Sequence, residues 1–127
     1  MYKFKALLIS LLISISSFSQ TSFSKAYKFY IGVKDTKSSP ITWDKNPIDV
    51  DILITISTDK VKIYSSETQV YHIVSEAEKS ENYAKYLAVD DDGNQCFYFI
   101  GYDKEYNVLY QMIEYADYAW MYLVIPN

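Results

Sequence analysis

Alternation of apolar and polar side chains constrains this chain more than any other feature. In IDVDILITIS, residues 48–57, five aliphatic side chains share one face: Ile48, Val50, Ile52, Ile54 and Ile56. Acidic and hydroxyl side chains lie mostly on the other face. Successive side chains of a β-strand point to opposite faces of the sheet, so this segment predicts a half-buried strand. The period is two in nearly every segment after residue 25, and the whole domain is therefore expected to be built from strands.

Seven further segments are predicted as strands: 26–34, 61–65, 68–75, 85–90, 95–102, 108–115 and 119–125. Most connections between them are short, and short connections require antiparallel pairing because parallel pairs need long crossovers. Two connections are longer: a polar segment with two prolines at residues 35–47, and EAEKSENY at 76–83, which we expect to be a loop. The sequence predicts an all-β fold, an antiparallel meander of about eight strands forming a small barrel or a sandwich, and sequential hairpins favour the barrel.

The first 19 residues form a signal peptide by their pattern. Lys3 and Lys5 precede the apolar run ALLISLLISI, and Ser17 and Ser19 are the small residues that a signal peptidase requires before the cut. A spanning helix needs about 20 apolar residues, and this run is too short. We therefore expect cleavage after Ser19, a single β domain over residues 20–127, no stable membrane insertion after cleavage, and an exported protein that is periplasmic or extracellular.

Charge and cysteine content exclude several classes of function. Without Lys3 and Lys5, ten lysines stand against 16 acidic residues, a formal charge of −6, and the chain has no arginine. Nucleic-acid binding needs a basic patch and uses arginine for most bidentate contacts, so no nucleic-acid partner is expected. Cys96 is the only cysteine, so no intramolecular disulfide is available and the core must hold the domain together.

The last three predicted strands are apolar on both faces, unlike residues 48–57. Strands of this kind are usually covered on both faces. Three explanations stay open: a lid formed by the N-terminal segment or by the loop at 35–47, a ligand in the mouth of the barrel, or a surface for a partner protein or a second copy. Tyrosine and tryptophan suit the last two, because each has an apolar body and a polar tip.

The segment VDDDGNQC, residues 89–96, looks most like a metal site. An EF-hand calcium loop aligned on Gly93 would need ligands at its first and twelfth positions, where this chain has Ala88 and Phe99. The alternating segments on both sides favour a hairpin instead. Asp92 and Gly93 are a favoured pair for a two-residue type I′ turn. No metal and no cofactor are therefore expected.

His72 and Cys96 are the candidates for catalysis, and both favour a structural role. A metal site at His72 would need further His or Cys ligands, and a thiol nucleophile at Cys96 would need a histidine in contact. No local signature surrounds either residue. Asp49 and Asp51 share one face of a strand, as two catalytic carboxylates could. A solvent-exposed polar face is the simpler explanation for this pair. We therefore assign no catalytic residues, and a hydrolase is the weakest of the alternative functions.

Aromatic side chains are the strongest remaining functional feature. Trp43 lies in the polar loop ITWDKNP, where it would plug one end of the sheet or form a stacking platform for a sugar. A ligand in the concave face of the sheet would contact Tyr98, Ile100, Tyr110 and Tyr122. Trp120 alternates with Tyr122 on the last strand, where both rings would pack inside. These six residues, Trp43 and Trp120 included, form the predicted ligand-binding set.

The layout of the chain resembles that of small secreted β-rich proteins of Bacteroidota. The resemblance rests on SFSQ at the predicted cut, DILITIS, VKIYSSETQVYHIV, VDDDGNQC and the terminal IEYADYAWMYLVI. It implies export by a Gram-negative bacterium and no particular activity. From the residues themselves we expect a non-enzymatic domain that binds a small apolar or aromatic ligand. The alternative is an interaction module that binds a protein, or forms a homodimer, through a tyrosine-rich face.

Overall fold

The computed structural model describes residues 21–126, and these residues form nine strands and no helix. The bounds of the strands are β1 Ser22–Val33, β2 Thr42–Trp43, β3 Ile48–Ile56, β4 Lys60–Tyr64, β5 Thr68–Lys79, β6 Tyr83–Asp90, β7 Gln95–Asp103, β8 Val108–Glu114 and β9 Tyr118–Pro126. All eight predicted strands are present, and the all-β prediction is confirmed. The predicted signal peptide lies outside the described residues.

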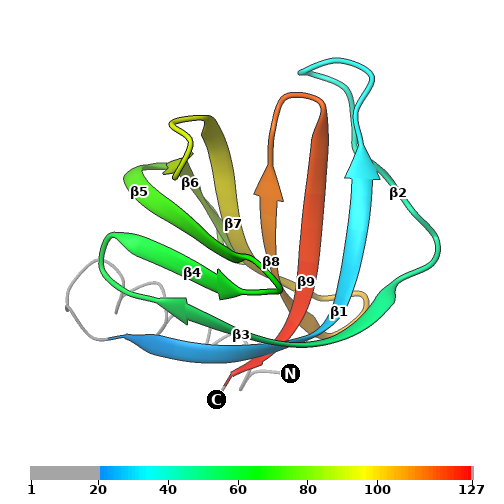
Figure 1. Ribbon diagram of the computed structural model, residues 1–127. Coiled ribbons are helices and arrows are strands. Elements are labelled where there is room, and N and C mark those ends of the chain that lie inside the picture. Colours follow the sequence, from blue (N-terminus) through cyan, green and yellow to red (C-terminus); the bar gives the residue numbers. More distant parts are fainter. Residues whose placement is uncertain (1–20, 127) are drawn as a thin grey trace.

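The strands form one antiparallel sheet that closes on itself. Their order is β2-β1-β3-β4-β5-β6-β7-β8-β9, and the pairing of β1 with β9 joins the two ends of the series (Figure 1). Eight strands therefore make a barrel, and the two-residue strand β2 is added beside the end of β1. Of the two architectures that the sequence allowed, the barrel is the one observed. Within residues 21–126, no helix is long and apolar enough to cross a membrane.

Three strands, β1, β5 and β6, differ from their predicted bounds by two residues or more. β1 begins at Ser22, and its registers with β3 and with β9 both shift at a bulge between Ala26 and Lys28. β6 begins at Tyr83 and β5 continues to Lys79, so the loop predicted at 76–83 is wrong at Tyr83 and at residues 76–79. These residues alternate poorly because both of their faces are exposed, and two bulges twist β5 against β6 along this stretch. Backbone pairing with β6 holds residues 76–79 in a strand although neither face of this stretch is buried.

The core fills the inside of the barrel. Tyr98, Ile54, Ile63, Ile113, Gln111 and Val61 are its largest fully buried side chains. Gln111 crosses the lumen as a polar bridge, since its Oε1 accepts a hydrogen bond from Tyr98 at 2.8 Å and its Nε2 donates to Ser24 Oγ at 3.2 Å. A second chain of bonds runs from Tyr71 to Gln69 and from Gln69 to Tyr122. Buried polar groups are tolerated where they are paired in this way.

The segment VDDDGNQC is a hairpin turn, as its flanking strands suggested, but of a different type. The N–H of Gly93 donates to the carbonyl of Asp90 at 3.0 Å, and the N–H of Asp90 donates to the carbonyl of Asn94. Only Gly93 has a positive φ in this turn, +84°, whereas a type I′ turn needs two such residues. The connection is therefore a three-residue loop over residues 91–93, a type I turn followed by glycine in the left-handed region. The predicted two-residue type I′ turn is wrong.

Candidate functional site: a groove on the outer face of the barrel

The wall formed by β1, β9 and β8 is apolar on its outer face as well as on its inner face. Directly opposed residues of an antiparallel pair point to the same side of the sheet. Tyr122 and Gln111 are opposed and buried inside, so their neighbours in sequence must point outward. Those outward pairs are Met112 with Met121 and Tyr110 with Leu123. The outer face of this wall thus carries large apolar side chains, each of them only partly buried.

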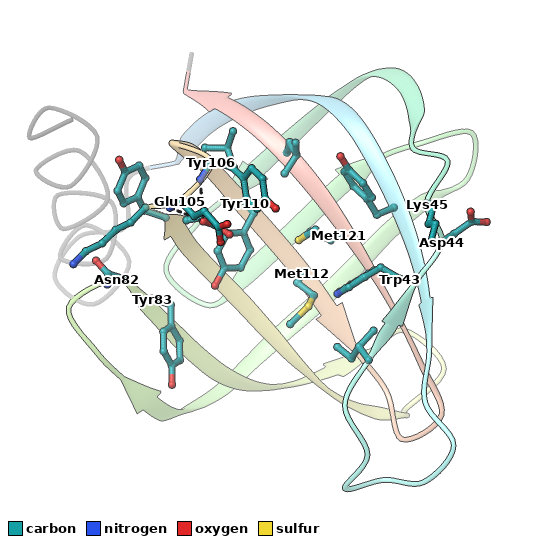
Figure 2. A pocket seen from close by; sticks show the side chains of 17 residues that line it. Trp43, Asp44, Lys45, Asn82, Tyr83, Glu105, Tyr106, Tyr110, Met112 and Met121 are labelled. Carbon is teal, nitrogen blue, oxygen red and sulfur yellow. Dashed lines mark hydrogen bonds between the residues drawn. The ribbon is translucent and has the colours of Figure 1, made fainter.

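An open groove of about 1210 Å³ runs over these side chains. Its floor consists of Tyr30, Tyr110, Met112, Met121 and Leu123, which come from three adjacent strands. In Figure 2, Trp43, Asp44 and Lys45 lie at one end of the groove, whereas Asn82, Tyr83, Glu105 and Tyr106 lie at the other, with the two methionines between them. Ile41, Tyr102, Asp103, Lys104 and Val108 complete the lining. We call this surface the outer groove.

Two of the three glycines of the chain lie under aromatic rings of the outer groove. A Cβ atom at Gly32 would come within 2.8 Å of the Trp43 ring and 2.4 Å of Ile41, and one at Gly101 would come within 2.4 Å of the Tyr110 ring. Only glycine therefore lets these rings lie directly against the backbone. Each ring covers the sheet with one side and is held in place by it. The predicted loop at 35–47, which contains β2, thus covers part of the outer face through Ile41 and Trp43 and leaves the outer groove open.

Charged side chains surround the ends of the outer groove. Asp44 and Lys45 lie at one end, and Asp103, Lys104 and Glu105 lie in the β7–β8 turn at the other. Asp103 shapes this turn, because its Oδ1 accepts hydrogen bonds from the backbone N–H groups of Glu105 and Tyr106. At the same end, Asn82 Oδ1 is buried and accepts no hydrogen bond within residues 21–126. The groove thus has an apolar floor between two polar ends that carry charges of both signs.

The neighbouring outer surface over β6 and β7 is covered by its own side chains. Lys85 Nζ lies 4.2 Å from the centre of the Phe97 ring and 5.5 Å from that of Phe99, a cation–π arrangement. Tyr83 lies 6.3 Å from Phe99, between ring centres, and donates a hydrogen bond to Glu78 at 2.5 Å. This hydrogen bond raises the pKa of the Tyr83 hydroxyl above its ordinary value. The lysine stem and the tyrosine shield the phenylalanines, so this part of the outer surface is less open than the outer groove.

The six residues of the predicted ligand-binding set do not lie together. Trp43 and Tyr110 line the outer groove. Tyr98, Ile100 and Tyr122 are at most 2% exposed and belong to the core. Trp120 faces inward with Tyr122 and contacts Tyr115 and Tyr118, with ring centres 5.6 and 5.5 Å away. A cavity shared by Tyr110 and the three core residues is therefore wrong, because Tyr110 lies on the opposite side of the sheet.

Burial changes the acid–base properties of the inner tyrosines. Removal from water raises the pKa values of Tyr71, Tyr86, Tyr98 and Tyr122 above the ordinary value near 10. Tyr115 also has a raised pKa, from burial and from the hydrogen bond of 2.6 Å that it donates to Asp90. That bond, together with the backbone N–H groups of Asn94 and Asp92, lowers the pKa of Asp90. The inner hydroxyls therefore remain neutral donors at physiological pH.

The candidates for catalysis are held apart by the sheet. Cys96 is 3% exposed and faces inward, and burial raises its pKa to about 11, which makes it a weak nucleophile at neutral pH. His72 is opposed to Val89 and points outward, where its Nε2 lies 3.2 Å from Asp91. A thiol–imidazole pair is impossible because the two side chains are on opposite faces. Asp49 and Asp51 are exposed and pair with Lys28 and Lys25, so they form the solvated face that the sequence indicated.

The sequence pattern missed most of the groove floor. Tyr30, Met112, Met121 and Leu123 were not among the predicted site residues, although the second apolar face of the last three strands marked this region. Two glycines within predicted strands were a further signal, since an isolated glycine in a strand often marks close approach of another group. Comparison with protein-family models, curated proteins and solved structures finds no match to this chain.

Proposed function

We propose that the protein binds a small apolar or aromatic ligand in the outer groove. The observation that carries this proposal is the uncovered floor of Tyr30, Tyr110, Met112, Met121 and Leu123, in a groove of about 1210 Å³. Binding sites for small molecules are concave and mostly apolar, with a few polar groups that fix orientation. Methionine adapts its shape to a ligand, and a ring held against the backbone loses little freedom on binding.

The ends of the outer groove indicate what the ligand carries besides its apolar body. Lys45 and Lys104 offer cations at opposite ends, and Asp44, Asp103 and Glu105 place carboxylates beside them. A ligand with an apolar or aromatic middle and a polar group at one end would satisfy both features. We further propose that the protein acts outside the cytoplasm, periplasmic or extracellular, because its first 19 residues have the pattern of a cleaved signal peptide.

Enzymatic activity finds little support in the described residues. His72 and Cys96 lie on opposite faces of the sheet, and the outer groove contains neither of them. Within residues 21–126, no three side chains of His, Cys, Asp or Glu gather closely enough to hold a metal ion. A binding domain is the function that the geometry supports best.

Native mass spectrometry of the protein purified gently from an exporting host tests this proposal. We expect a mass above that of the bare chain, with the excess identifying the ligand. The double variant Trp43→Ala/Tyr110→Ala should lose the excess mass. Leu87→Ala, which removes an apolar side chain from the outer face away from the groove lining, should keep it. Retention of the excess by the double variant would place the ligand elsewhere.

A further inference from the structure

The wall of the barrel is incomplete beside β3. On one side β3 pairs with β1 along its length, but on the other side it pairs with β4 only at residues 54–56. Among residues 21–126, no strand pairs with this second edge between Ile48 and Leu53. We call residues 48–53 the open edge. Its six residues span about 20 Å, which is the length of an ordinary strand.

Side chains that face the inside of the barrel are exposed around this gap. Ile48 is opposed to Phe29, Ile31 to Trp120, and Val33 to Tyr118, so all of them share the inward face. Nevertheless, Ile48, Ile31 and Val33 are 51%, 47% and 57% exposed, and Tyr118 is 40% exposed. A complete wall would cover an inward face. Ile48 lies on the open edge itself, whereas Ile31, Val33 and Tyr118 lie beyond the last β1–β3 pair, Phe29 with Ile48. The exposed inward surface therefore adjoins the missing stretch of strand at its Ile48 end.

We propose that an extended segment of a partner protein completes the wall by adding a strand at the open edge. Strand addition draws its affinity from main-chain hydrogen bonds and its specificity from alternate side chains. The side chains of the guest that point inward would pack on Ile48, Val50 and Ile52. The side chains that point outward would lie beside Asp49 and Asp51. The guest is therefore an alternating segment with apolar residues inward and lysine or arginine outward.

Charge decides between a partner and a second copy of this chain. Asp49 and Asp51 keep 84% of their side-chain surface exposed although they pair with Lys28 and Lys25. If two copies paired antiparallel through their open edges, the acidic side chains of both would lie in one outward row. Like charges opposed across strands are destabilising, whereas opposite charges stabilise the pair. The open edge thus disfavours a copy of itself and favours a basic strand.

Fluorescence anisotropy with a labelled seven-residue peptide of alternating lysine and valine tests the proposal on the protein from an exporting host. We expect saturable binding, with the amides of residues 48–53 protected from hydrogen exchange in the complex. A peptide with glutamate in place of lysine should not bind. The double variant Asp49→Lys/Asp51→Lys should bind the lysine peptide about tenfold more weakly, because two exposed attractions become repulsions. The matched variant Asp59→Lys/Asp92→Lys has the same net charge and should bind normally.

N-methylation distinguishes strand addition from charge attraction alone. Methyl groups on alternate amides of the lysine peptide keep its charges but block the main-chain bonds along one edge, and one of the two alternate patterns must abolish binding. Equal binding of both methylated peptides and the parent would overturn the proposal. No binding of the parent peptide would overturn it, as would protection of residues in the outer groove instead of residues 48–53. Binding at the open edge and binding in the outer groove are thus tested separately.

Discussion

The inner and outer faces of the wall formed by β7, β8 and β9 are both aromatic, and they differ in what their tyrosines contact. Inside, Tyr98 donates to Gln111 and Tyr122 accepts from Gln69, so each hydroxyl has a partner. Outside, Tyr110 lies against Gly101 and borders the outer groove. The same residue type thus stabilises the barrel on one face and forms a candidate binding surface on the other.

Hydrophobicity alone therefore does not distinguish the core face of this barrel from its proposed binding face. Both faces of β8 carry large side chains. The two faces differ only in the residues around them, which come from distant parts of the chain. The inner face is completed by Ser24 and Gln69, whereas the outer face is bordered by Trp43 and by the turn at 103–107. Substitutions that affect one face should therefore leave the function of the other intact.

Truncation of matched tyrosines should give the largest contrast. Tyr98→Ala should lower the free energy of unfolding by about 3–5 kcal/mol, because it removes a fully buried ring and leaves Gln111 without its donor. Tyr110→Ala should cost at most about 2 kcal/mol, since this ring is only partly buried. Urea denaturation followed by circular dichroism measures both. Equal losses would show that the outer tyrosine is a core residue.

Alkaline pH should reveal the buried tyrosines of the core without mutation. Burial raises the folded-state pKa of Tyr98 above its unfolded value, so the folded state keeps its proton where the unfolded chain loses it. Stability should thus be full below pH 10 and fall above it, by about 1.4 kcal/mol per pH unit for each such tyrosine.

Tyrosinate absorbance at 295 nm and circular dichroism, recorded together against pH, test this expectation. The inner tyrosines should ionise only as the circular dichroism collapses. Complete ionisation near pH 10 with an intact β spectrum would contradict a sealed interior.

Glycine substitutions should affect binding and stability separately. Gly101→Ala should displace the Tyr110 ring, weaken ligand binding by about tenfold and cost about 1 kcal/mol of stability. Gly93→Ala should cost about 1–2 kcal/mol through its φ of +84° and leave binding unchanged, because nothing lies within 4 Å of the new methyl group. Parallel measurements of unfolding and of ligand titration would reveal any loss of binding in Gly93→Ala, which would contradict the placement of the site.

Polar substitutions should give the smallest contrast. Ser24→Ala removes the acceptor for Gln111 Nε2 inside the barrel and should cost about 1 kcal/mol. Asp49→Asn removes an exposed ion pair on the outer face and should give no measurable change in the urea midpoint. A larger effect for Asp49→Asn than for Ser24→Ala would reverse the assigned roles of the two faces.

Alternation predicted the strands but could not predict the site. The run from Ile48 to Ile56 was predicted with its correct inward face because its outward face is polar. On β8 and β9 both faces are apolar, so the pattern could not say whether Tyr110 or Gln111 points inward. The register decides this, and it depends on the bulge of β1 near Tyr27 and on the closure of β1 with β9. The strand over residues 76–79 was missed because hydrogen bonds alone hold it.

Tryptophan fluorescence most directly tests the claim that the ligand site is on the outer face. The chain has two tryptophans, Trp43 in the outer groove and Trp120 on the inward face. Trp120→Phe leaves the outer reporter, and Trp43→Phe leaves the inner one. In titrations with a brominated alcohol, an apolar molecule that quenches tryptophan only at contact distance, we predict saturable quenching of Trp43 and none of Trp120. Quenching of Trp120 with an unchanged Trp43 signal would place the site inside the barrel and contradict this account.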